Sequence, residues 1–228
     1  MFDIEEFKEL IQQIKKTGKT FSTNWKQKNK NLIFLRHDID FCLNSALQIA
    51  KVEKDLEICS NFFFMMSSNM YNLLSKENLT IVKEIKKMNH KISIHLDYNL
   101  FKNHYFLTEE IKLFEKMFQV KVDIISIHRP QDFLKKNNDT INSIAHTYQD
   151  AYFKEMEYIS DSGGTNPKGK IEDFINKKGS DKNLQLLMHP IWWTKRTNNP
   201  TNTLNHFKSN HLEFFTNQIS INCKTYEK

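Results

Sequence analysis

The stretch Leu32-Ile-Phe-Leu-Arg-His-Asp-Ile-Asp40 carries most of the information about the fold. Its first four residues are apolar, and the next five positions hold four ionisable side chains. The apolar run predicts a short buried strand. A protein interior tolerates such a charge cluster only where a metal, an ion pair or a substrate compensates it. Capping of the following helix by Asp38 and Asp40 is the other interpretation.

The same pattern recurs four more times along the chain. Each of four further apolar segments runs into ionisable residues, which are His95 and Asp97, His128 and Arg129, Asp161, and His189. Helix capping explains one such segment easily, but five are hard to explain in this way. In a parallel α/β barrel the carboxyl ends of all strands lie at one rim. We therefore expect these side chains to converge on a shared site.

Helical patterns fill the intervals between these segments. The sequence predicts strands at 32–37, 58–66, 91–96, 123–128 and 184–188, and helices at 3–17, 46–52, 81–88, 108–118 and 203–219. This alternation is typical of a parallel sheet that is wound or closed into a barrel. Residues 132–160 are less regular and receive no firm assignment. We predict one α/β domain over residues 1–228.

Composition excludes several other classes of protein. No run of about 18 uncharged apolar residues occurs, so no transmembrane helix is expected. The first residues are acidic, whereas a secretory signal is basic and then apolar. Cys42, Cys59 and Cys223 are odd in number and lack CxxC spacing, which argues against disulfides and a thiolate zinc site. We expect a cytoplasmic protein.

The net charge of +6 does not indicate nucleic-acid binding. The lysines lie mostly on predicted helix faces beside glutamates, and no arginine-rich or aromatic-interleaved patch occurs. The three arginines are Arg36, Arg129 and Arg196, and two of them fall in the segments described above. Nucleic acid is therefore not an expected partner.

At these residues the chain resembles the polysaccharide deacetylase family, carbohydrate esterase family 4, also called NodB-like. The matching elements are Asp38-x-Asp40, the segment Asn89 to His95, Arg129-Pro130 and Leu187-x-His189. The resemblance spans about residues 32–190. It implies a distorted (β/α) barrel of about seven strands, and a divalent metal that assists removal of acetyl groups from sugars.

The resemblance also implies roles for individual residues. Asp38 would be the general base, Arg129 would orient it, and His189 would be the general acid. Asp40 and His95 would bind the metal, which we expect to be zinc, with cobalt, nickel or iron as alternatives. Such residues meet the needs of amide or ester hydrolysis, namely an activated water, a polarised carbonyl and a protonated leaving group.

The third metal ligand is less well specified by the motifs. The family has a second histidine where this chain has Asn99, and Lys91 and Ser93 replace its usual glutamate and glycine. His128 is our prediction for this ligand, and Asp97 and Asn99 are alternatives. This divergence is typical of an intracellular branch of the superfamily.

Four further residues are predicted to contact substrate, namely His37, Asp97, Asp161 and Trp192. An indole at the rim would suit the apolar face of a sugar. His90 and His104 are expected at the surface. The predicted substrate is a small, lipid-linked or nucleotide-linked amino sugar in surface polysaccharide biosynthesis. The alternative functions are a non-catalytic carbohydrate-binding protein and a metal-dependent phosphohydrolase, the latter suggested by the adjacent His37 and Asp38.

Overall fold

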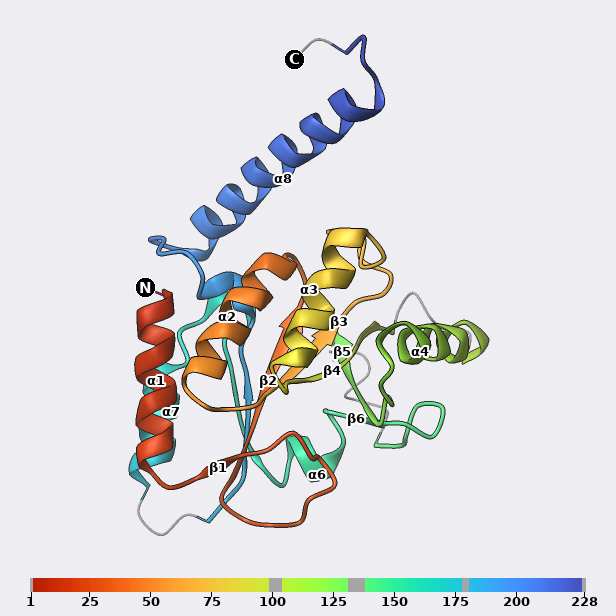
Figure 1. Ribbon diagram of the computed structural model, residues 1–228. Coiled ribbons are helices and arrows are strands. Elements are labelled where there is room, and N and C mark those ends of the chain that lie inside the picture. The colour runs from red at the N-terminus through yellow and green to blue at the C-terminus, as the bar shows by residue number, and fades with distance from the viewer. Residues whose placement is uncertain (1, 99–103, 131–137, 178–180, 227–228) are drawn as a thin grey trace.

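A curved parallel sheet forms the centre of the molecule (Figure 1). The computed structural model describes residues 2–98, 104–130, 138–177 and 181–226. The strands run in the order β6-β5-β4-β3-β2-β8-β7, with β1 paired to β2. Their bounds are Thr20–Phe21 (β1), Leu32–Ile39 (β2), Asn61–Phe64 (β3), Lys91–Asp97 (β4), Ile124–His128 (β5), Ala145–His146 (β6), Glu157–Ser160 (β7) and Leu184–Leu187 (β8).

All pairings between these strands are parallel. Because parallel strands need crossover connections, helices separate most of them and cover the outer face of the sheet. The helices are Ile4–Lys16 (α1), Leu43–Asp55 (α2), Lys76–Lys87 (α3), His104–Phe118 (α4), Asp150–Phe153 (α6), Lys168–Asn176 (α7) and Pro200–Asn222 (α8), with short 3₁₀ turns at Ser162–Gly164 and Pro190–Trp192. Seven strands curl into a half-barrel, which confirms the predicted distorted (β/α) barrel.

Helix α1 shows how local sequence sets these elements. Asp3 caps it by accepting a hydrogen bond from the Glu6 amide at 2.9 Å, and its buried face is formed by Phe7, Leu10, Ile11 and Ile14. Gly18 follows the helix with a φ of +75°, a conformation that glycine adopts without steric cost. The prediction of a helix over 3–17 is confirmed.

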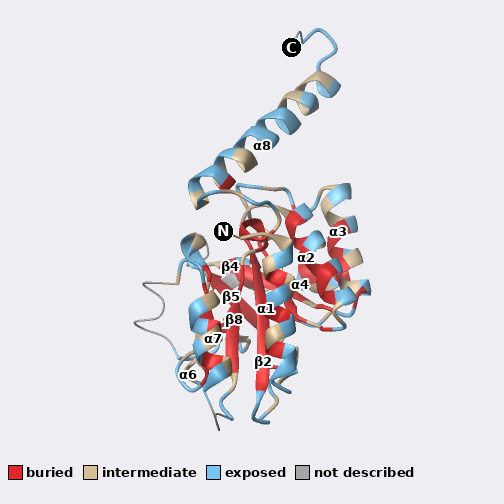
Figure 2. Ribbon diagram, turned by 90° about the vertical axis from the view of Figure 1, so that its left-hand side faces the viewer, coloured by how far each residue is buried: buried red, intermediate tan, exposed pale blue. Residues whose placement is uncertain are grey.

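Two apolar layers lie on opposite faces of the sheet. Side chains from alternate positions of β2 enter both, since successive strand residues point to opposite sides. Ile33 and Leu35 join the large core between sheet and helices, whereas Phe34 packs with Phe63 and Trp25 inside the curved sheet. Figure 2 shows these strands as the most buried part of the molecule. The inner layer supports the residues at the carboxyl ends of the strands.

Helix α8 differs from the prediction. It runs from Pro200 to Asn222 and extends away from the body of the molecule (Figures 1 and 2). Leu204 and Phe207 pack against the core, as an amphipathic helix requires, but Leu212 is 64% exposed and Phe215 is 57% exposed. The predicted apolar face therefore contacts the body only in its first half. Among the described residues, no helix is long and apolar enough to cross a membrane.

Candidate functional site

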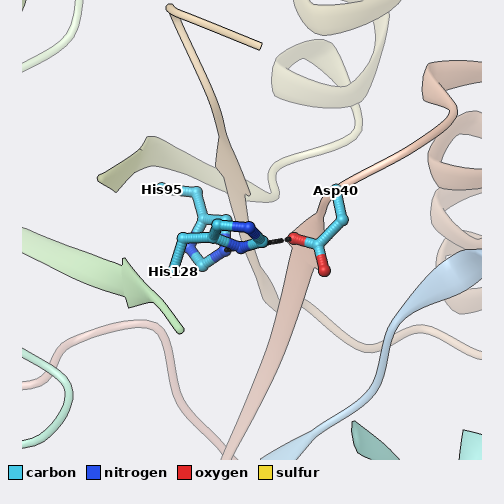
Figure 3. A group of neighbouring side chains, drawn as sticks. All are labelled: Asp40, His95 and His128. Carbon is cyan, nitrogen blue, oxygen red and sulfur yellow. Dashed lines mark hydrogen bonds and ion pairs between the residues drawn. The ribbon is translucent and has the colours of Figure 1, made fainter. Parts of the chain in front are cut away.

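Three potential metal ligands meet at the carboxyl ends of strands β2, β4 and β5 (Figure 3). Asp40 follows β2, His95 lies on β4 and His128 ends β5. Oδ1 of Asp40 is 3.1 Å from Nε2 of His95 and 3.4 Å from Nδ1 of His128, and these two nitrogens are 3.2 Å apart. The sequence-based expectation that Asp40 and His95 share one site agrees with this arrangement.

These three residues fit a divalent metal ion. Ligand atoms bound at about 2.0–2.2 Å in a tetrahedron lie about 3.3–3.6 Å from one another, close to the separations found here. Oδ1 of Asp40 is buried and accepts no well-directed hydrogen bond from the described residues. Burial alone would raise the pKa of Asp40, but the imidazoles of His128 and His95 outweigh it and hold the pKa well below its usual range. The carboxylate is thus ionised and ready to bind a cation.

Asp38 lies beside this cluster and is held by Arg36. Nε of Arg36 donates to Oδ1 of Asp38 at 2.8 Å, and Nη2 donates to Oδ2 at 2.5 Å. Arg36 is fully buried and also donates to Gln185 and to Tyr148, whose ring lies 4.8 Å from the guanidinium carbon. Burial opposes ionisation of Asp38, but the Arg36 charge prevails and lowers its pKa. Asp38 is therefore an oriented, ionised carboxylate.

His189, just after β8, forms the other wall of the site. Its Nδ1 lies 2.6 Å from Oδ1 of Asp161, and its backbone amide donates to the same carboxylate. The indole of Trp193 donates to Oδ2 of Asp161 at 2.7 Å, so that carboxylate is fixed. Burial lowers the pKa of His189, but Asp161, Asp40 and Asp38 together raise it to about 9. The Nε2 atom faces Asp40, with 3.8 Å to its Oδ2.

These groups line one cavity of about 470 Å³. A cavity of this volume can hold a small ligand such as a sugar residue. Its lining comprises Asp38, Asp40, His95, Ile127, His128, Arg129, Pro130, Tyr148, Ser162, Gly163, Leu187 and His189. Residues from β2, β4, β5 and β8 therefore converge as the strand-end pattern predicts.

His37 does not belong to this cavity, which corrects the prediction that it contacts substrate. It is fully buried on the other face of β2, where Nε2 lies 2.7 Å from Glu53 and Nδ1 lies 2.9 Å from the carbonyl oxygen of Met188. The alternation of strand residues explains the difference, because His37 and Asp38 must point to opposite sides. His90, expected at the surface, is also buried here and contacts Ser60 and Glu53.

The other three predicted substrate contacts also lie outside the cavity lining. Asp161 is fully buried beneath His189, and Trp192 is 6% exposed and packs edge-on against Phe41. Asp97 ends β4 and is half-buried, but it does not line the cavity. Asn99, one alternative for the third ligand, lies outside the described residues.

Arg129 also differs from its expected role. Its described hydrogen bond runs from Nε to Nε2 of His128 at 2.9 Å, and the carboxylate of Asp38 is bound by Arg36 instead. Arg36 is not among the predicted site residues, although period-two alternation places Arg36, Asp38 and Asp40 on one face of β2. This alternation of site-facing residues can be read from the sequence alone.

Comparisons with known proteins give no match to a family model and none to a curated protein. Solved structures do resemble this chain. They include a pseudoenzyme of carbohydrate esterase family 4 from Bacillus anthracis, with 16% identity over 82% of this chain and a TM-score of 0.46. The chain spans 62% of that protein's length.

Two deacetylases show similar values. The chitin deacetylase of Colletotrichum lindemuthianum shares 13% identity over 81% of this chain and 84% of its own, with a TM-score of 0.46. The peptidoglycan deacetylase PdaC of Bacillus subtilis shares 14% identity over 82% of this chain and 85% of its own, with a TM-score of 0.45. The neighbours thus include proteins of the family that the motifs resemble.

Proposed function

We propose that this protein is a metal-dependent hydrolase that removes an acetyl or similar acyl group from an amino sugar. The observation that carries the proposal is the cluster of Asp40, His95 and His128 with Asp38 and His189 at the same cavity. Three protein ligands with room for a further one are typical of catalytic zinc. The bond cleaved would be the C–N bond of an amide or the C–O bond of an ester.

The metal would be held by Asp40, His95 and His128. A divalent ion supplies charge that polarises the acyl carbonyl and lowers the pKa of a water molecule. Oxygen and imidazole ligands suit zinc, and also cobalt, nickel or iron. Nδ1 of His95 lies 2.5 Å from the hydroxyl of Ser126, which leaves Nε2 directed at the ligand cluster. Such outer contacts fix the ring orientation of a ligating histidine.

Asp38 would accept the proton of the attacking water. It is ionised because of Arg36, and the two hydrogen bonds from that guanidinium leave lone pairs on both carboxylate oxygens for a further proton donor. The bidentate contact fixes the plane of the carboxylate. Arg36 would therefore take the orienting role that the family resemblance implies for Arg129.

His189 would protonate the leaving amine or hydroxyl. Asp161 holds the Nδ1–H group, so the second proton of the imidazolium is carried by Nε2, which faces the cavity. Without bound metal, burial lowers the pKa of this histidine, but Asp161 and then Asp40 and Asp38 raise it to about 9, so it is protonated at neutral pH. It is thus charged and positioned to donate a proton when the bond to the leaving group breaks.

The substrate would be a small amino sugar or one linked to a nucleotide or lipid, as a precursor in surface polysaccharide biosynthesis. The cavity volume of about 470 Å³ is sufficient for a single sugar residue. A cytoplasmic location remains a prediction from the sequence. The phosphohydrolase alternative has lost its support, because His37 faces Glu53 behind the sheet and does not act with Asp38.

The test is acetate release from N-acetylated amino sugars by protein loaded with zinc, cobalt or nickel. Asp38→Asn and His189→Ala should each lower turnover by at least about a hundredfold, since a general acid or base contributes about 10²–10⁴-fold. Both variants should retain bound metal. The exposed residues Asp55 and His211 provide matched controls as Asp55→Asn and His211→Ala, which should keep wild-type turnover.

Two outcomes would contradict the proposal in different ways. Metal-loaded wild-type protein that releases no acyl product from any tested sugar would favour the carbohydrate-binding alternative. Turnover that survives both substitutions would leave the hydrolase assignment intact but would remove Asp38 and His189 from their roles.

A further inference from the structure

Arg129 stands out among the residues that line the cavity. It is exposed, and its backbone has a φ of +50°, in the left-handed region. A residue with a large side chain seldom adopts this conformation, and such strained backbone is often found at functional sites. The neighbouring His128 and Pro130 also line the cavity. Arg129 is therefore held at the cavity entrance in an unfavourable backbone conformation.

The carboxylates of the site already have partners. Arg36 neutralises Asp38, and His189 neutralises Asp161 at 2.6 Å. Asp40 faces the two histidines with which it forms the candidate metal cluster. Among the residues that the structure describes, no carboxylate forms an ion pair with Arg129.

The hydrogen bond between Arg129 and His128 can form only while His128 binds no metal through Nδ1. In the structure Nε of Arg129 donates to Nε2 of His128, which must then be an acceptor. A neutral imidazole has one donor and one acceptor nitrogen. When Nδ1 of His128 binds a metal, Nε2 carries the proton and can no longer accept this hydrogen bond. Metal binding therefore releases Arg129 for another acceptor.

We infer that Arg129 binds an anionic group of the substrate, a phosphate or a carboxylate attached to the amino sugar. This inference rests on the proposed function and specifies its substrate class. A guanidinium binds either anion through two parallel hydrogen bonds, which a lysine cannot do. Ser162 also lines this cavity, and its hydroxyl lies 2.6 Å from that of Ser160. Arg129 would then determine specificity and take no part in the acyl transfer.

Equilibrium binding to zinc-loaded protein tests this inference. Every protein in this comparison also carries Asp38→Asn, so that the N-acetylated probes bind without being hydrolysed, and wild type here means that Arg129 is unchanged. The probes are N-acetylglucosamine, N-acetylglucosamine 1-phosphate and N-acetylmuramic acid, which are neutral, phosphorylated and carboxylated, respectively. Wild-type protein should bind one charged probe about 10- to 100-fold more tightly than the neutral sugar, as expected for charge-assisted hydrogen bonds. Which charged probe is preferred distinguishes phosphate from carboxylate.

Variants at Arg129 supply the decisive comparison. Arg129→Gln should remove the preference, and Arg129→Lys should keep part of it, because lysine retains the charge but not the paired hydrogen bonds. Arg196→Gln is the control, since Arg196 is 71% exposed and contacts Asp3. It should behave as wild type. Should either Arg129 variant fail to fold, the other still gives the comparison.

The inference is overturned if wild-type protein binds all three probes equally, or if Arg129→Gln retains the preference. The second result would mean that the anion binds the metal instead. Acetate release is measured separately on the corresponding proteins that retain Asp38. A preference that depends on Arg129 without any acetate release would uphold the anion site and refute the proposed reaction. Acetate release without a preference for a charged probe would uphold the proposed reaction and refute the anion site.

Discussion

Two clusters of histidines and carboxylates lie on opposite faces of strand β2. The front cluster contains Asp40, His95 and His128 and lines the cavity. The back cluster lies between the sheet and helix α2, and its members are His37, Glu53, Ser60 and His90. Both contain residue types that bind metals or transfer protons, so residue type alone does not separate them.

The difference lies in how their polar atoms are satisfied. In the back cluster Glu53 is fully buried and accepts from His37 and Ser60, while His90 accepts from the Ser60 amide and donates to the carbonyl of Ala50. Burial lowers the pKa of His90, which fits this neutral form. In the front cluster Asp40 keeps a buried oxygen without a directed hydrogen bond, beside a cavity. Closed networks stabilise a fold, whereas an incomplete one leaves room for a ligand.

The largest expected effect is on metal binding at the front. Asp40→Asn should abolish stoichiometric metal uptake, because an amide oxygen is a weaker ligand than a carboxylate. Elemental analysis of zinc-loaded protein gives the result, with far-UV circular dichroism as the check on folding. Asp97→Asn is the control, since Asp97 lies at the same edge outside the cavity lining. Loss of metal only in Asp97→Asn would replace Asp40 by Asp97 as a ligand.

The back cluster should respond in the opposite way. Glu53→Ala should lower the free energy of unfolding by about 3–5 kcal/mol, because it leaves two buried hydrogen-bond donors unpaired and creates a cavity. The folded fraction should still bind metal stoichiometrically. Glu84→Ala is the control, because Glu84 forms an exposed ion pair with Lys51 that contributes at most about 1 kcal/mol. Urea unfolding measures both variants, and a loss of metal in folded Glu53→Ala protein would show that the clusters are not independent.

A pH dependence should mark His189 in the metal-free protein. Its pKa is raised to about 9 on folding, so its stabilising effect is complete below the unfolded pKa of about 6.5 and is lost as pH rises through about 9. The difference in unfolding free energy between wild type and His189→Gln should shrink by up to about 3 kcal/mol over this range. Urea unfolding at a series of pH values, after chelation, measures this difference. If this difference in unfolding free energy does not change with pH, the pKa of His189 is not raised on folding.

The smallest effect should come from the hydroxyl behind His95. Ser126→Ala removes the contact to Nδ1 of His95 and should weaken metal binding about 10- to 100-fold, as is usual for outer contacts of a ligand. Competition with a chelator of known affinity gives the dissociation constant. Ser93→Ala is the matched control, because Ser93 is equally buried on β4 but donates to the carbonyl oxygen of Ile124. Equal loss of metal affinity in both variants would indicate general loosening of the paired strands β4 and β5.

Much of the fold is predictable because the chain alternates cleanly between strand and helix. The buried strands β2, β4, β5 and β8 each read as a short apolar run, and each ends near an ionisable residue. The segment between β5 and β7 is different, because its two-residue strand β6 and four-residue helix α6 are too short to show a period. No pattern in the sequence distinguishes such elements from loop.

The site is predictable in its position but less so in its individual contacts. Strand ends identify Asp40, His95, His128 and His189, which the structure brings together at one cavity. Whether a neighbouring polar residue faces the ligand or supports another side chain depends on tertiary packing. Asp161 illustrates this, because its burial beneath His189 follows from the positions of β7 and β8 in the sheet. The sequence alone does not contain that geometry.

The projecting second half of α8 has a consequence for the dynamics of the chain. From Leu212 onward this helix has little packing against the body, and an isolated helical segment of about 12 residues is only marginally stable in water. Its amide protons should therefore exchange with solvent orders of magnitude faster than those of β2, which open only with the whole domain. Hydrogen exchange should thus divide this one continuous helix into a slow segment near Leu204 and Phe207 and a fast segment beyond them.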